Sequence, residues 1–179
     1  MPMGARFRLQ KISRQHALND LVARAFASAC LPVTKEPHGL TRSDGKRPDG
    51  LTLVPWKEGK PLTWDVTAVC PLADLYVEAS ARDPGSAAEQ AARCKADKYS
   101  ALGRTHVFQL IAVETLDPIN LAACSFLSEL RRKISAICCE DREISFLFQR
   151  MPVLVRLRYN AILLRQSFTE ENRPIMTFR

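Results

Sequence analysis

The chain has 179 residues, of which 46% are hydrophobic and 25% are charged, a balance that suits one globular domain with a buried core. Its net charge of +7 favours an anionic partner, nucleic acid before a membrane, since no segment approaches the ~18 apolar residues of a membrane span. Residues 1–15 are basic but lack the apolar core of a signal peptide, so we expect an intracellular protein, nuclear or cytoplasmic.

The N-terminal part predicts one helix followed by a short edge strand. Residues 1–12 form a basic lead-in, and an apolar stripe at helical spacing then predicts a helix over 13–29 with Ser13 as its N-cap. Pro32 ends this unit. Residues 33–36 suit a short strand, and the composition of residues 37–45 is that of a loop.

The stretch from 44 to 69 predicts a β-hairpin that carries two aspartates. Proline at position 48 favours an extended entry to the first strand at Asp49, and Gly59 suits a turn that needs a positive φ. The returning strand, 62–69, alternates apolar and polar residues, so Asp65 and Thr67 share the face opposite the apolar one.

A second helix and a buried strand are predicted next. Ser86 and Glu89 have the spacing of a capping box for a helix over 87–102, and Gly103 suits its end. Residues 107–113 are almost continuously apolar, as in a strand buried on both faces. The order strand, helix, strand predicts a mixed α/β sheet with a right-handed crossover.

The C-terminal part reads as helical. Apolar periodicity predicts helices over 118–138 and 142–165, the second interrupted at Pro152, with a frayed tail from residue 169. Basic side chains on these helices suit either phosphate contact or a solvated face; they are Arg131, Arg132, Lys133, Arg150, Arg156, Arg158 and Arg165. The six cysteines form no CxxC pair and no zinc-finger spacing, which predicts reduced thiols in the core.

Asp49 and Asp65 are the candidate metal ligands. Carboxylates on adjacent strands form the hard-oxygen site that Mg²⁺ or Mn²⁺ prefers. The alternative is an exposed loop aspartate beside an ordinary solvent-facing strand aspartate.

The motifs RPDG at 47–50, DVT at 65–67 and KADKY at 95–99 together resemble the PD-(D/E)xK nuclease superfamily. Within it, they are similar to the restriction-like endonuclease domains of non-LTR retrotransposons and other retroelements that encode a reverse transcriptase. The resemblance covers roughly residues 16–165. It implies an α/β fold with a restriction-endonuclease-like core, a mixed central β-sheet flanked by helices, over residues 13–116. The C-terminal helices over 117–168 and the tail over 169–179 would extend that core.

The resemblance also implies roles for individual residues. Asp49 and Asp65 would bind Mg²⁺ or Mn²⁺, but Thr67 stands where the family has lysine. Lys98, which we prefer for the phosphate contact, or Lys95, both on the helix over 87–102, would supply that charge. The spacing of Lys95 and Tyr99 resembles the QxxxY element of some relatives. Further implied members are an acidic residue, Asp20 or alternatively Glu36, and the phosphate contacts Arg47 and Lys46.

The implied function is metal-dependent nicking of DNA at an integration target. A reverse transcriptase module of the same element would then use the exposed 3′ hydroxyl, since a YxDD-like polymerase motif is absent from this sequence. One alternative is a catalytically inactive module that keeps the fold and binds nucleic acid, which Thr67 favours. Another is a structural domain without affinity for DNA.

Overall fold

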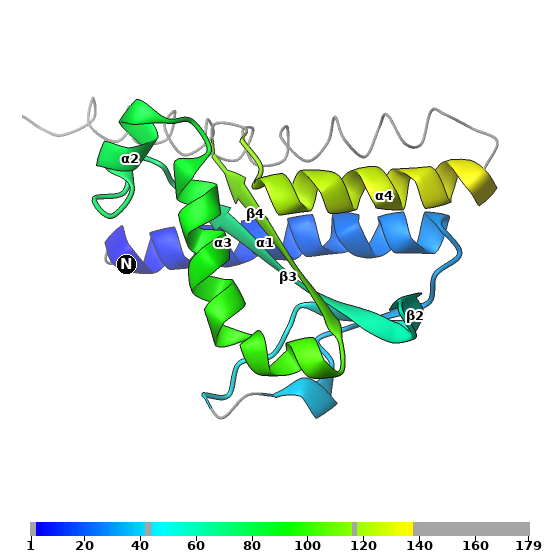
Figure 1. Ribbon diagram of the computed structural model, residues 1–179. Helices are drawn as coiled ribbons and strands as arrows, with labels where there is room; N and C mark the ends of the chain where they lie inside the picture. The colour runs from blue at the N-terminus through cyan, green and yellow to red at the C-terminus, as the bar shows by residue number, and fades with distance from the viewer. Residues whose placement is uncertain (1–2, 42–43, 116–117, 138–179) are drawn as a thin grey trace, which may run out of the picture.

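The computed structural model describes residues 3–41, 44–115 and 118–137. Its elements, in chain order, are α1 (Met3–Ser28), β1 (Val33–Lys35), η1 (His38–Leu40), β2 (Gly50–Lys57), β3 (Lys60–Val69), α2 (Val77–Arg82), α3 (Ser86–Lys98), η2 (Ser100–Arg104), β4 (Val107–Glu114) and α4 (Leu121–Ile137) (Figure 1). The predicted helix over 142–165, with its basic residues, and the predicted tail lie outside the described residues.

The sheet has four strands in the order β1-β2-β3-β4, and it is mixed, as predicted. β1 pairs antiparallel with β2, and β2 pairs antiparallel with β3, whereas β3 and β4 are parallel. A parallel pair needs a long connection between its strands. Here that connection contains α2, α3 and η2.

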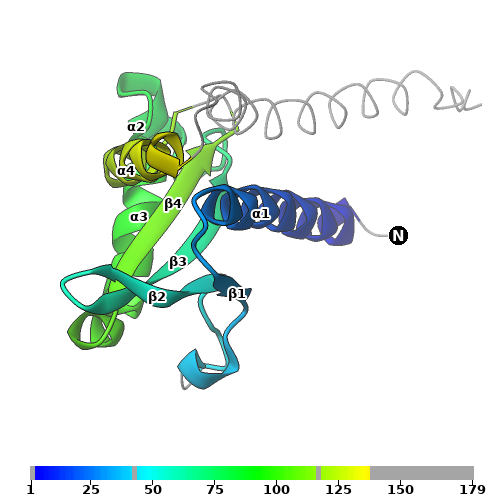
Figure 2. The ribbon, with the colours of Figure 1, turned by 90° about the vertical axis from the view of Figure 1, so that its right-hand side faces the viewer.

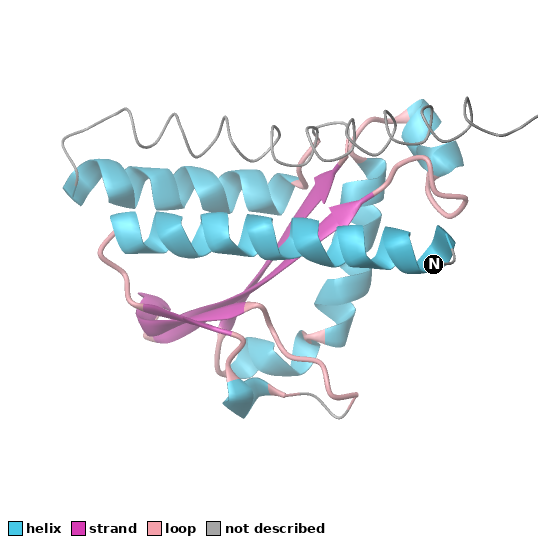
Figure 3. Cartoon of the chain, turned by 180° about the vertical axis from the view of Figure 1, so that it is seen from behind, coloured by secondary structure: helices cyan, strands magenta, loops and turns pink. Residues whose placement is uncertain are grey.

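Helices cover both faces of the sheet (Figure 2). The apolar side chains of β3 pack with α1 and α4 in one core that includes Phe26, Trp64 and Leu127. On the opposite face, α3 lies close to β3 and β4 through its small residues Ala88 and Ala91. Figure 3 shows α1 and α4 beside one another across the strands. The alternation along β3 therefore separates a large core from the face on which Asp65 lies.

The hairpin between β2 and β3 is tighter than predicted. β2 continues to Lys57 and β3 resumes at Lys60, so that only Glu58 and Gly59 form the turn. Both have positive φ, 52° and 72°, as the type I′ turn requires. The expected positive φ at Gly59 is confirmed.

Helix boundaries depart from prediction at two places. α1 begins at Met3, so the basic lead-in is part of the helix rather than a separate segment. α3 has no side-chain cap hydrogen bond at its N-terminus, and the predicted capping box of Ser86 and Glu89 is wrong. Glu89 instead accepts a hydrogen bond from the amide of Leu121, 2.6 Å away at the start of α4.

A backbone amide in the first turn of α3 finds its hydrogen-bond acceptor on a strand of the sheet. The buried carboxylate of Glu114, at the end of β4, accepts a hydrogen bond of 3.0 Å from the backbone amide of Ala88. A carboxylate near a helix N-terminus also interacts favourably with the helix dipole. This contact ties the start of α3 to the end of β4.

The cysteines also differ from expectation. Cys30, Cys70, Cys94 and Cys124 are free thiols, but only Cys70 is even partly buried. The prediction of core thiols is therefore wrong for Cys30, Cys94 and Cys124, which are exposed. Their apolar sequence neighbours face the core while they do not.

Candidate active site

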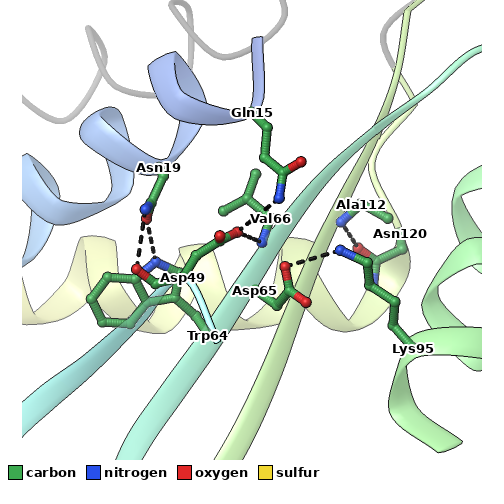
Figure 4. Close-up of polar contacts among 9 residues, drawn as sticks. All are labelled: Gln15, Asn19, Asp49, Trp64, Asp65, Val66, Lys95, Ala112 and Asn120. Carbon is green, nitrogen blue, oxygen red and sulfur yellow. Dashed lines mark hydrogen bonds and ion pairs between the residues drawn. The ribbon is translucent and has the colours of Figure 1, made fainter. Parts of the chain in front are cut away.

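The carboxylates of Asp49 and Asp65 lie close together, at the point where β2 begins beside β3 (Figure 4). Asp49 directly precedes β2, and its backbone amide donates to the carbonyl of Trp64 at 2.9 Å. Asp65 follows Trp64 on β3 and is buried, with 4% of its surface exposed. The alternative of a solvent-facing strand aspartate is therefore wrong for Asp65.

The backbone of Asp49 is held on several sides. Its carbonyl accepts hydrogen bonds from the amide of Glu36, at 3.0 Å, and from Asn19 Nδ2, at 3.1 Å. Together with the bond to Trp64, these contacts place Asp49 between the edge strand, α1 and β3. The carboxylate thus starts from a fixed backbone although its residue lies in a loop.

Asn19 links this loop to the core. Its Oδ1 accepts a hydrogen bond of 2.8 Å from the buried indole nitrogen of Trp64, while its Nδ2 binds the Asp49 carbonyl. One turn earlier on α1, Gln15 Nε2 donates to Asp49 Oδ2 at 3.4 Å. We did not predict either role from the sequence. The available signal was Asn19 itself, a polar residue inside the apolar stripe, four positions after Gln15.

Gly50 has a packing role beside Asp49. A Cβ at this position would lie 2.0 Å from Cζ2 of Trp64, so the indole occupies the space that any side chain would need. The glycine of the RPDG motif therefore lets the strand carrying Asp49 approach Trp64 closely.

Burial raises the pKa of Asp49 to about 7, and the neighbouring charge of Asp65 adds to this effect. A side-chain hydrogen bond with Asp65 acts in the same direction. The backbone amide of Val66, which donates to Asp49 Oδ2 at 2.7 Å, lowers the pKa and offsets part of the increase. Two carboxylates that resist simultaneous ionisation form a place where a cation would be favourable.

The donor set fits Mg²⁺ or Mn²⁺. The part of the chain that the structure describes holds no group of three or more His, Cys, Asp or Glu residues suited to a metal. Mg²⁺ nevertheless commonly binds through one or two carboxylates and completes its octahedron with water and substrate phosphate. Asp49 and Asp65 supply that number of carboxylates.

Lys95, rather than Lys98, contacts the carboxylate pair. Its Nζ lies 2.9 Å from Asp65 Oδ1, in an ion pair that is largely buried. Thr67, two residues after Asp65 on the same face of β3, lines the space beside it. A cation thus reaches the carboxylates from α3, through one of the two lysines predicted for this place.

A pocket of about 610 Å³ surrounds these groups, and we call it the central pocket. Besides Asp49, Asp65 and Lys95, four charged side chains line it: Glu36, Lys46, Arg47 and Lys98. Arg47 forms an ion pair with Glu36, whose pKa is lowered by the hydrogen bond and the charge of Arg47. Glu36 therefore shares the pocket with the aspartates but is engaged by arginine.

Other predicted site residues lie apart from the central pocket. Asp20 is exposed on α1 and pairs with Lys35 at 2.6 Å. Arg131, Arg132 and Lys133 lie on α4, and the ammonium of Lys133 sits 4.7 Å from the centre of the Trp56 ring. These four predicted residues are not among those that line the pocket.

No described helix combines the length and apolar character needed to cross a membrane. Comparison with protein families finds no family model that matches this sequence, and no curated protein matches it either.

Proposed function

We propose that this chain is the endonuclease module of a retroelement, with a restriction-endonuclease-like core, and that it uses Mg²⁺ or Mn²⁺ to nick DNA at an integration target. The observation that carries the proposal is the convergence of Asp49, Asp65 and Lys95 in one pocket. These are the groups that phosphodiester hydrolysis needs: oxygen ligands for a metal and a cation beside the phosphate.

Each of these side chains has a defined task. A bound Mg²⁺ would polarise the scissile phosphate and lower the pKa of the attacking water. Asp49 and Asp65 would hold the metal, and Asp49 becomes available as its carboxyl ionises around pH 7. Lys95 would offset the charge that builds on the phosphate in the transition state. The nick would leave a 3′ hydroxyl for a reverse transcriptase module of the same element.

The basic lining of the central pocket supports a nucleic-acid substrate. Lys46, Arg47 and Lys98 line it around the carboxylates. Arg47 offers bidentate hydrogen bonding to phosphate, for which it would exchange its present partner Glu36. The net charge of +7 adds a general attraction for DNA.

A nicking assay on supercoiled plasmid tests the proposal. We expect the full chain to produce open circles with Mg²⁺ or Mn²⁺ and none with EDTA. Asp49→Ala and Asp65→Ala should each slow nicking by roughly a hundredfold or more, whereas Asp97→Ala, which removes an exposed carboxylate on α3, should leave it unchanged.

The possible outcomes separate the alternatives. Equal nicking by the wild type and both aspartate variants would remove the catalytic role. DNA binding that survives both substitutions, without cleavage by any variant, would identify an inactive binding module, the function that Thr67 favours. The absence of salt-dependent DNA affinity would leave a structural domain.

A further inference from the structure

A second cavity, of about 470 Å³, opens directly beside the central pocket. The two share Thr67, Lys95 and Lys98 as lining residues. The second cavity extends from them along the end of β3 to Arg14 of α1 and to Tyr76, just before α2. We call it the side pocket.

The lining of the side pocket combines positive charge with an apolar, aromatic wall. Arg14 is almost fully buried, with 9% of its surface exposed, and Lys98 adds a second cationic group. Tyr76 contributes an aromatic ring, and small residues of β3 and α3, such as Ala68 and Ala91, form the rest of the wall. Among the described residues that line the side pocket, none is acidic.

Such a lining suits a ligand that is both planar and anionic. Nucleotides meet this description, because a base stacks on an aromatic ring while its phosphate pairs with arginine or lysine. Burial raises the pKa of the Tyr76 hydroxyl, with a smaller contribution from Cys94, and this favours the neutral ring. A neutral ring suits an anionic ligand, since a charged phenolate would repel a phosphate.

The size and position of the side pocket narrow the class of ligand further. The volume lies in the range of pockets that enclose one small molecule. It is too small for a base-paired duplex, whose major groove alone is about 12 Å wide. Because the side pocket joins the central pocket at Lys95, a strand with one phosphate at Asp49 and Asp65 would bring its next nucleotide to this cavity.

We infer that the side pocket receives one unpaired nucleotide adjoining the scissile phosphate, with its base against Tyr76 and its phosphate near Arg14 and Lys98. This inference rests on the proposed function and names the form of its substrate: DNA that is single-stranded or locally unpaired at the cleavage point. A fully paired site would have to release one base, at a cost in unpairing energy.

Binding measured without cleavage tests the inference. The full chain is titrated in EDTA against a fluorescent single-stranded oligonucleotide and against the same sequence as a duplex. Tyr76→Ala should weaken single-strand binding by roughly five- to a hundredfold, and leave duplex binding within about twofold. Tyr76→Phe, which keeps the ring, should bind like the wild type. Val77→Ala, at the next and exposed position, serves as the matched control.

A single-stranded oligonucleotide containing 2-aminopurine reports on the base itself. Its fluorescence should change on binding to the wild type and to Tyr76→Phe, and less on binding to Tyr76→Ala. Circular dichroism checks that all variants are folded. Equal single-strand affinity of the wild type and Tyr76→Ala would overturn the inference, as would equal losses for single strand and duplex, or no single-strand binding at all.

The nicking assay separates this inference from the proposed function. Nicking that depends on Asp49 and Asp65, with no effect of Tyr76 on single-strand binding, would refute nucleotide binding in the side pocket and leave the proposed function in place. Single-strand binding that depends on Tyr76, in a protein that never nicks DNA, would refute hydrolysis and keep the pocket as a nucleotide site.

Discussion

Replacing Asp49 with asparagine should stabilise the metal-free protein at alkaline pH. The carboxyl of Asp49 has a pKa of about 7 in the folded chain, against 3.8 as its ordinary value, because burial and Asp65 disfavour its charge. Below pH 3.8 this carboxyl is protonated in both the folded and the unfolded chain. Between pH 3.8 and 7 only the folded chain keeps the proton, so its stability falls as the pH rises.

The size of the effect follows from this difference in pKa. Full ionisation of Asp49 costs the folded chain about 4 kcal/mol, and about 2.5 kcal/mol of that falls between pH 5 and pH 8. Asparagine carries no charge, while its Oδ1 can still accept the hydrogen bond from the amide of Val66. We therefore expect the stability of Asp49→Asn, relative to the wild type, to increase by about 2.5 kcal/mol from pH 5 to pH 8.

Urea unfolding of both proteins in EDTA, at several pH values across this range, measures the difference. Asp97→Asn, which changes an exposed carboxylate on α3, is the control for the loss of one acidic side chain away from the site. A stability difference between Asp49→Asn and the wild type that does not change with pH would refute the raised pKa of Asp49 in the folded chain. Saturating Mg²⁺ should stabilise the wild type and not Asp49→Asn, since the metal binds the ionised carboxylate.

Three further substitutions test the surroundings of the carboxylates. Lys95→Met leaves the buried Asp65 without its ion pair and should cost about 2 to 3 kcal/mol in urea unfolding without metal; the loss should shrink when Mg²⁺ is added, and an undiminished loss would contradict a metal at this place. Gly50→Ala forces a methyl group against the Trp64 ring and should lower the thermal midpoint by about 6 to 12 °C; an unchanged midpoint would show that the indole moves freely. Asn19→Ala leaves the indole nitrogen of Trp64 without its acceptor and should cost about 1 to 3 kcal/mol of unfolding free energy. It should also slow Mg²⁺-dependent nicking in the plasmid assay, because Asp49 loses a backbone contact; nicking at the wild-type rate would show that this contact does not position the carboxylate.

Periodicity predicted the sheet and its principal helices well. The apolar stripe of α1, the alternation along β3 and the continuous apolar run of β4 each reflect which side chains are buried. These patterns can be recognised from residues that lie close together in the sequence. The mixed sheet followed from the order of these elements. The six-residue α2 was not predicted, because so short a helix has no recognisable period.

The carboxylate pair was predictable because a hairpin brings its strands together by local geometry. The choice between Lys95 and Lys98 was not, since it depends on how α3 is rotated against the sheet. Ala91 faces the sheet, and Lys95, four residues later, lies on the same side of the helix. The contributions of Gln15 and Asn19 required knowing that α1 crosses above Asp49, which is a long-range feature.

The hydrogen bond between Glu114 and the Ala88 amide has a consequence for the order of folding. A helix with its own side-chain cap could form early and alone. In α3, by contrast, the Ala88 amide gains its acceptor, the Glu114 carboxylate, only after β4 has joined the sheet. We expect the Ala88 amide to exchange its hydrogen only when β4 detaches, in native-state hydrogen exchange. Lys95 would then reach Asp65 as one of the last events in folding, so that partly folded chains would lack a complete site.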